Sequence, residues 1–178
     1  MLESLLQLDG AILLWIQEHV RRDFLSPVVK FITHLGDAGW CWILLAVILL
    51  IVKKTRKIGL VTAVSLLSSY VVNNLILKNL VARVRPYEAV DGLQRIIEAQ
   101  SDFSFPSGHS ASSFAAAVVF FMLCPRKYGV PALVLAFLIA LSRLYVGVHY
   151  PTDVLTGVIS GTVIAVIVCT VYKKKFVQ

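Results

Sequence analysis

The chain has 178 residues, of which 58% are hydrophobic and 15% are charged, and its mean hydropathy is +0.81. A soluble domain has about 25% charged residues, so this chain carries more apolar surface than a core of its size can bury. The composition therefore indicates lipid as the solvent and excludes a soluble enzyme or a disordered regulator. It also argues against a nucleic-acid binder, despite the net charge of +7. The length allows one domain, which we expect to occupy residues 1–178.

Residues 1–37 contain no apolar stretch long enough to cross a bilayer. The apolar run Ala11–Ile16 is flanked by charged residues, and a second apolar stretch follows Pro27. We predict two amphipathic helices that lie in the membrane interface, and a tilted sixth span is the alternative. Because no basic segment precedes the first apolar run, we expect no cleavable signal peptide.

Five stretches within residues 38–178 lack Asp, Glu, Lys and Arg and are candidate membrane spans. A bilayer core of about 30 Å takes about 20 helical residues, so the two shortest stretches need their flanks to complete a crossing. The sequence therefore predicts an all-α, polytopic membrane bundle of about five transmembrane helices. The candidate spans are Ala38–Val52, Ile58–Leu77, Phe103–Pro125, Tyr128–Ser142 and Val154–Tyr172.

Three basic segments set the expected orientation. If the spans alternate, Lys53–Lys57, Arg126–Lys127 and Lys173–Lys175 lie on one side, and none of them holds any of the ten acidic residues. Cytoplasmic loops carry the excess of Lys and Arg, so we place these segments in the cytoplasm of a plasma-membrane protein. The opposite side also carries cations, but several of those stand in motifs with another expected task.

The first motif consists of two cations at the end of the second candidate span. Lys78 closes the span, and Arg85-Pro86 follows two helical turns later. If the helix continues, Lys78 and Arg85 face the same way. Two cations that converge at a helix end suit a multiply charged anion. The alternative is that both side chains only reach for the membrane interface.

The second motif opens the third candidate span with Ser107, Gly108 and His109. A helix that begins here presents free backbone N–H groups at these three residues, which form a ready anion site. Gly108 allows the backbone to approach a ligand closely, and His109 can donate a proton to a phosphate ester oxygen. The alternative is a capped helix with an incidental histidine.

The third motif joins the fourth and fifth candidate spans. Arg143 ends one span, Asp153 opens the next, and His149 lies between them. Since His149 and Asp153 are four residues apart, the carboxylate can reach one imidazole nitrogen and leave the other free as a nucleophile or base. The alternative is a loop histidine beside an acid that stabilises a helix N-terminus. Alternating spans bring all three motifs to the face opposite the basic segments, so we predict an extracytoplasmic active site.

Together the motifs resemble the type 2 phosphatidic acid phosphatases. That family includes lipid phosphatases, glucose-6-phosphatase and, more distantly, the vanadium haloperoxidases. Its signature is K-x6-RP, then PSGH, then SR-x5-H-x3-D. All three parts are present, as Lys78-x6-Arg85-Pro86, Pro106-Ser107-Gly108-His109 and Ser142-Arg143-x5-His149-x3-Asp153.

The resemblance implies a lipid phosphatase that needs neither a metal nor another cofactor. His149 would attack phosphorus and form a phosphohistidine, with Asp153 orienting it, while His109 would protonate the leaving oxygen. The residues that would hold the non-bridging phosphate oxygens are Lys78, Arg85, Ser107, Gly108 and Arg143. The sequence agrees with the absence of a metal, because that face has no obvious carboxylate cluster for Mg²⁺.

Short members that resemble this chain are often undecaprenyl-diphosphatases, so undecaprenyl diphosphate is the expected substrate. A phosphatidylglycerophosphate or phosphatidate phosphatase, a lipid phosphotransferase and a non-enzymatic transporter or scaffold are the alternatives. The expected partners are a lipid phosphate and the bilayer, and no nucleic acid. Arg95, in the loop Tyr87–Phe103, is a further candidate phosphate contact. The small residues Gly157-x3-Gly161 permit close helix packing, either within the bundle or at a homodimer seam.

Overall fold

The computed structural model describes residues 2–176, and all regular elements in this range are helices. A short segment joins α5 to α6, and a long irregular loop joins α6 to α7. The elements in chain order are α1 (Leu2–Trp15), η1 (Ile16–Val20), α2 (Ser26–His34), η2 (Asp37–Gly39), α3 (Trp40–Ile51), α4 (Arg56–Ser69), η3 (Tyr70–Leu77), α5 (Lys78–Val81), α6 (Pro86–Ala89), α7 (Gly108–Leu123), α8 (Arg126–Tyr145) and α9 (Pro151–Phe176).

Each of the five charge-free stretches forms a helix, as predicted, and the chain is a multi-pass membrane protein. Three helical segments are long and apolar enough to span a bilayer, namely Arg56–Ala89, Arg126–Tyr145 and Pro151–Lys175. A fourth span results if Ser26–His34 and Asp37–Ile51, which meet at 45°, form one bent crossing. The remaining apolar helix, α7, is shorter than these. The number of five spans stays a prediction.

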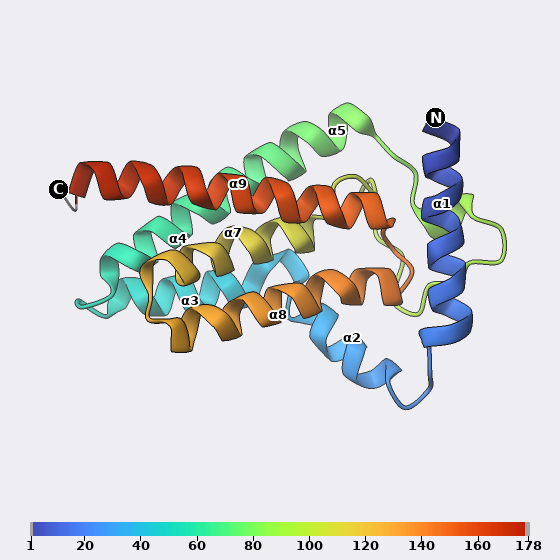
Figure 1. Cartoon of the computed structure of the whole chain (residues 1–178), viewed down its shortest axis with the longest axis horizontal. Coiled ribbons are helices and arrows are strands. Elements are labelled where there is room, and N and C mark those ends of the chain that lie inside the picture. The colour runs from blue at the N-terminus through green and yellow to red at the C-terminus, as the bar shows by residue number, and fades with distance from the viewer. Residues whose placement is uncertain (1, 177–178) are drawn as a thin grey trace.

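The long helices run side by side along the long axis of the molecule, and α1 crosses one end of the bundle (Figure 1). The loops that join α3 to α4 and α7 to α8 lie at the opposite end, together with the end of α9. These three places hold the basic segments, whereas the loops around the N-termini of α7 and α9 lie beside α1. The motif residues and the basic segments therefore occupy opposite ends of the bundle, as the sequence predicts.

Helix α7 forms the centre of the bundle and packs against α8, α9 and α4. Its alanines Ala115, Ala116 and Ala117 are fully buried, so neighbouring helices can approach closely. A Cβ atom added at Gly157 of α9 would lie 2.6 Å from the Ser107 carbonyl oxygen, which leaves no room for a side chain. The small-residue pattern of α9 therefore serves packing within the bundle.

The second predicted span ends in a break that the sequence analysis did not anticipate. The helix continues past Lys78 only to Val81, and Ala82 adopts a left-handed conformation with φ of 47°. Arg85 is extended and precedes the short helix α6, because a residue before proline avoids the helical conformation. The expectation that Lys78 and Arg85 share one face of a continuous helix is therefore wrong. The two side chains come together because both form an ion pair with Asp102.

Candidate active site

A cavity of about 1440 Å³ opens at the end of the bundle where the three motifs meet. Of the eight residues predicted for the site, five line this cavity and three lie behind its wall. Ser107, Arg143 and Asp153 are the three behind it, and each is almost fully buried. The five lining residues are Lys78, Arg85, Gly108, His109 and His149.

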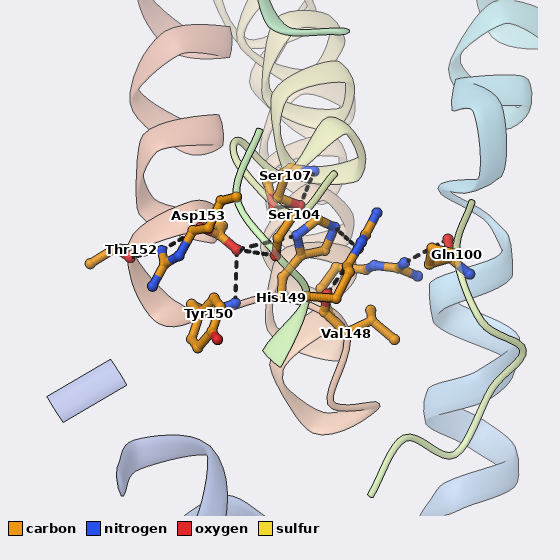
Figure 2. A network of polar contacts seen from close by, with 12 residues as sticks. Gln100, Ser104, Ser107, Val148, His149, Tyr150, Thr152 and Asp153 are labelled. Carbon is orange, nitrogen blue, oxygen red and sulfur yellow. Dashed lines mark hydrogen bonds and ion pairs between the residues drawn. The ribbon is translucent and has the colours of Figure 1, made fainter. Parts of the chain in front are cut away.

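His149 lies in the loop between α8 and α9 and faces Arg85 with one nitrogen and Asp153 with the other. Its Nε2 is 3.1 Å from Nη1 of Arg85, and its Nδ1 is 3.6 Å from Oδ2 of Asp153. The second distance is longer than a hydrogen bond, so the predicted pairing is a close contact in this structure. The Asp153 carboxylate accepts hydrogen bonds from Ser104 Oγ at 2.5 Å and from the Tyr150 N–H at 3.0 Å (Figure 2).

The surroundings of His149 favour a neutral imidazole. The side chain is 2% exposed, and burial together with the guanidinium groups of Arg85 and Arg143 holds the pKa of His149 well below its usual value. A neutral imidazole keeps a free electron pair on one nitrogen, which is the form that a nucleophile requires. The geometry leaves Nε2, on the Arg85 side, as the nitrogen available for that role.

Asp153 is also tied to the N-terminal helix, a connection that the sequence analysis missed. Arg83 donates to Asp153 through Nη1 at 2.7 Å and to Asp9 of α1 through Nη2 at 2.8 Å. Asp9 is 2% exposed and also accepts a hydrogen bond from the Thr152 hydroxyl. The Arg83 guanidinium lies 3.7 Å above the ring of Tyr150. Helix α1 is therefore part of the structure that holds the carboxylate. The sequence analysis did not single out Asp9, because an acidic residue in an amphipathic helix is expected to face water.

Lys78 and Arg85 are bridged by a carboxylate from the long loop before α7. Asp102 forms ion pairs with both cations, and the one with Arg85 Nη2 measures 2.5 Å. Although burial alone would raise it, the hydrogen bond and charge of Lys78 and the charge of Arg85 hold the pKa of Asp102 below its usual value. A phosphate that binds both cations has to displace this carboxylate. The sequence analysis did not single out Asp102.

Arg143 is a buried cation that has only neutral partners among the described residues. It is 1% exposed, donates to Thr33 Oγ1 at 2.6 Å and to Gln100 Oε1 at 3.4 Å, and leaves its Nε without a partner. An unpaired buried charge is costly, so this environment favours the binding of an anion. The observation agrees with the predicted phosphate-binding role, although Arg143 must turn towards the cavity to perform it.

Ser107 acts as the N-cap of α7, and its backbone N–H is already used. Its hydroxyl accepts a hydrogen bond from the Ser110 N–H at 3.4 Å, while its own N–H donates to the Asp153 carbonyl at 3.1 Å. The prediction that three free N–H groups begin this helix is therefore wrong for Ser107, because the packing of α9 supplies an acceptor. Gly108 lines the cavity beside Asn74, and a Cβ added there would lie 3.1 Å from the amide of Asn74.

His109 stands in the first turn of α7 and is 14% exposed towards the cavity. Its Nε2 donates to Oδ1 of Asp37 at 2.8 Å, and Asp37 comes from the turn η2 before α3. At the mouth of the cavity, Arg95 donates to the Ile97 carbonyl at 2.9 Å and lies above the ring of Tyr87. The structure therefore brings the two motif histidines and the predicted cations to one end of the bundle, namely Lys78, Arg85, Arg95 and Arg143.

Comparisons with known proteins identify the family of the chain. The model of the PAP2 superfamily matches residues 58–176. An undecaprenyl-diphosphatase of Sulfolobus acidocaldarius is 32% identical over 138 residues, which is 78% of this chain and just under two thirds, 66%, of that relative. A decaprenylphosphoryl-5-phosphoribose phosphatase of Mycobacterium tuberculosis is 33% identical over 154 residues, 85% of this chain and 83% of that protein.

A solved structure supports the same assignment. The PAP2-type phosphatidylglycerolphosphate phosphatase from Bacillus subtilis superposes with a TM-score of 0.80 at 28% identity, covering 97% of this chain and 88% of that one. The family match covers more than half of the sequence and includes all three motifs. The chain therefore belongs to the PAP2 superfamily and is a membrane lipid phosphatase, a hydrolase of phosphoester or diphosphate bonds.

Proposed function

We propose that the protein is an undecaprenyl-diphosphate phosphatase that acts through a phosphohistidine and needs no metal ion. The proposal covers the whole chain as one phosphatase domain, with residues 1–37 as interfacial helices and residues 38–178 as the bundle that carries the site. The observation that carries it is the shape of the cavity, which has a cationic end and a long apolar extension.

The cavity continues from the phosphate-binding cations into the bundle between α3 and α4. Apolar side chains of both helices line this extension, together with Tyr70 of η3. From Lys78 to Ala63 the helix covers roughly 20 Å at about 1.5 Å per residue, so the groove reaches well into the bilayer. A phosphate head with a long hydrocarbon tail fits this arrangement. The apolar lining residues are Ile43, Ala46, Val47, Leu50, Ala63, Leu66 and Leu67.

The mouth of the same cavity favours a substrate with a second phosphate group. Lys30 and Arg95 line this cavity together with Lys78 and Arg85. Arg95 is exposed, whereas Lys78 and Arg85 are buried, so Arg95 marks the mouth and the other two mark the inner end. A diphosphate can place its reacting phosphorus against the inner cations and its other charges nearer the mouth. The name of the Sulfolobus relative agrees with this choice, and a phosphatidylglycerophosphate phosphatase is the alternative that the Bacillus structure favours.

In the proposed reaction, Nε2 of His149 attacks phosphorus, and the bond from phosphorus to the leaving oxygen breaks. His109 gives a proton to that oxygen. Water then attacks the phosphohistidine, His109 takes a proton from the water, and inorganic phosphate leaves while His149 is restored. Lys78, Arg85 and the Gly108 N–H hold the non-bridging oxygens, and Ser107 and Arg143 are the further proposed contacts behind the wall.

A phosphate-release panel tests the substrate. The panel compares undecaprenyl diphosphate, farnesyl diphosphate, phosphatidylglycerophosphate, phosphatidate and a soluble phosphate ester, all with detergent-solubilised protein. We expect undecaprenyl diphosphate to give the highest kcat/KM, by at least about tenfold, which corresponds to about 1.4 kcal/mol of transition-state stabilisation. A preference for phosphatidylglycerophosphate instead would replace the proposed substrate, and transfer of phosphate to an added lipid alcohol would identify a phosphotransferase.

The same panel in excess EDTA examines the absence of a metal. Within residues 2–176, no three His, Cys, Asp or Glu side chains are grouped so that they could hold a metal ion. Because cations of the chain itself neutralise the phosphoryl group, we expect the rates to be unchanged by chelation. Loss of turnover that Mg²⁺ restores would contradict the proposed chemistry.

Cysteine accessibility tests the proposed extracytoplasmic site. In a variant whose native cysteines are replaced by alanine or serine, a cysteine at Glu98 should react with a membrane-impermeant thiol reagent on intact cells. A cysteine at Thr55, which lies at the opposite end of the bundle, should react only after the membrane is broken. The reverse pattern would place the site in the cytoplasm, where an outer-leaflet diphosphate lipid cannot reach it.

A further inference from the structure

The turn η2, which carries no motif, places a carboxylate directly on His109. Asp37 accepts hydrogen bonds from two histidines through its two oxygens. His109 Nε2 lies 2.8 Å from Oδ1, and His34 Nδ1 lies 2.7 Å from Oδ2. A carboxylate only accepts hydrogen bonds when ionised, so each of these nitrogens carries its proton towards Asp37.

The backbone around Asp37 is shaped to allow this contact. Ala38 and Gly39 both have positive φ, of 49° and 68°, and a positive φ is costly for alanine. Just before Asp37, a Cβ atom added at Gly36 would lie 2.6 Å from Cδ2 of His109 and would collide with the ring. The turn therefore lies directly against the imidazole, and a strained residue follows the carboxylate.

The contact fixes which nitrogen of His109 remains for chemistry. With Nε2 donating to Asp37, Nδ1 is the nitrogen left for the substrate, and among residues 2–176 it forms no hydrogen bond. His109 needs a proton on Nδ1 to protonate a leaving oxygen, and the ring is then a cation. The negative charge of Asp37 stabilises that cation, while the hydrogen bond holds the ring in one orientation.

We infer that Asp37 is a positioning residue that orients His109 and stabilises its protonated form for transfer of a proton to the leaving oxygen. The inference rests on the proposed function, because it gives His109 the role of general acid. Asp37 itself touches neither substrate nor phosphorus in this account. His34 adds only an exposed hydrogen bond to the outer oxygen of Asp37, since its side chain is 62% exposed.

The test uses two substrates that differ in their need for an acid. Attack on phosphatidate expels the alkoxide oxygen of diacylglycerol, which needs a proton. Attack on p-nitrophenyl phosphate expels p-nitrophenolate, a stabilised phenoxide that needs little help. General acid catalysis is worth about 10²–10⁴-fold, so His109→Ala should lose that much with phosphatidate and far less with the aryl ester. Asp37→Asn keeps the shape and removes the charge, and we expect roughly 10–100-fold loss with phosphatidate and little with the aryl ester.

Companion variants separate this role from a structural one. Asp37→Ala removes both charge and hydrogen bond and should lose more than Asp37→Asn, with the same dependence on leaving group. His34→Ala should change either rate by less than about threefold, as expected for an exposed pair. Asp23→Asn, an exposed acid outside the cavity, is the matched control. Retained aryl phosphatase activity shows that each variant is folded.

The double variant decides the outcome. If Asp37 acts through His109, then Asp37→Asn combined with His109→Ala should be no slower on phosphatidate than His109→Ala alone. An additive loss, or an Asp37→Asn effect that is equal on both substrates or absent, would overturn the inference while leaving the proposed function intact. If His109→Ala itself shows no dependence on the leaving group, the general-acid role falls, and the inference falls with it.

Discussion

Replacing His149 by alanine is expected to remove phosphatase activity with every substrate and to prevent formation of a phosphoenzyme. The variant lacks the imidazole whose Nε2 faces Arg85, which is the nucleophile of the proposed reaction. Loss of a nucleophile that acts together with a base costs on the order of 10⁵–10⁶-fold in kcat. The measurement is phosphate release together with trapping of ³²P-labelled protein after a rapid acid-free quench.

His109→Ala should behave differently in the same assay. It removes the proton donor but leaves His149 and its cationic surroundings in place. With p-nitrophenyl phosphate the variant should still form the labelled phosphoenzyme, and the label should persist longer because the base for the attacking water is gone. Equal losses for both variants with all leaving groups would contradict this division of roles.

A matched histidine control is available in η1, which directly follows α1. His19 of η1 stacks on Trp15 with ring centroids 5.3 Å apart, and it is not among the residues that line the cavity. His19→Ala should leave kcat within about twofold of the parent, as surface substitutions usually do. A large loss from this variant would show that alanine at a histidine damages the fold in general, and the His149 result would then carry no mechanistic meaning.

The sequence was sufficient to predict the bundle because membrane helices are defined by local composition. A run without charges must satisfy its backbone within itself in lipid, so each charge-free stretch became a helix. The convergence of Lys78, His109 and His149 followed from alternating spans, which requires no knowledge of side-chain packing. The resemblance to the family then gave each of these residues an expected role in the reaction.

What the sequence could not predict depends on contacts between segments far apart in the chain. Three carboxylates reach the site from α1, η2 and the loop before α7, namely Asp9, Asp37 and Asp102. In a hydrophobicity pattern an acidic residue is assigned to a water-exposed position, so none of the three was predicted to lie in the site. Asp37 and Asp102 pair with motif residues, namely His109, Lys78 and Arg85, whereas Asp9 pairs with Arg83, which is outside the motifs. A search for carboxylates able to compensate those buried charges is the signal that could have found them, since buried cations need partners.

The break after Val81 shows that a spacing argument can fail when it assumes a continuous helix. A spacing of two helical turns correctly associates Lys78 with Arg85, but for the wrong reason. The left-handed Ala82 and the proline at position 86 end the helix, and the pair is joined through Asp102 instead. The spacing predicted that the two cations lie close together, whereas only the fold showed that Asp102 lies between them.

Arg85→Ala is expected to have the next largest effect, because this side chain touches the proposed nucleophile, His149, and lines the proposed phosphate site. Its Nη1 lies 2.8 Å from the Val148 carbonyl oxygen and 3.1 Å from His149 Nε2, while Nη2 and Nε bind Asp102. A phosphorus that His149 attacks must therefore sit within reach of the same guanidinium. Losing one such fixed donor costs about 10²–10³-fold in kcat.

Arg85→Lys should recover little of this loss. The guanidinium is a planar fork that holds Val148 on one side and Asp102 on the other, whereas an ammonium is a single charge on a flexible stem. Arg126→Ala is the control, since Arg126 lies at the opposite end of the bundle, 4.0 Å above the ring of Phe121. That variant should retain parental activity. A melting curve in detergent is also needed, because truncation leaves the Val148 carbonyl unpaired at a cost of about 1–3 kcal/mol.

Whether Arg85→Ala changes kcat or KM shows at which stage of the reaction Arg85 acts. If it stabilises charge that develops as the leaving oxygen departs, Arg85→Ala should lower kcat and kcat/KM by similar factors. A rise in KM with unchanged kcat would assign Arg85 to ground-state binding of the phosphate, equally strong before and during the reaction. Retention of activity within about threefold would contradict both, and it would leave Lys78 and Arg143 as the cations that neutralise the transferred phosphoryl group.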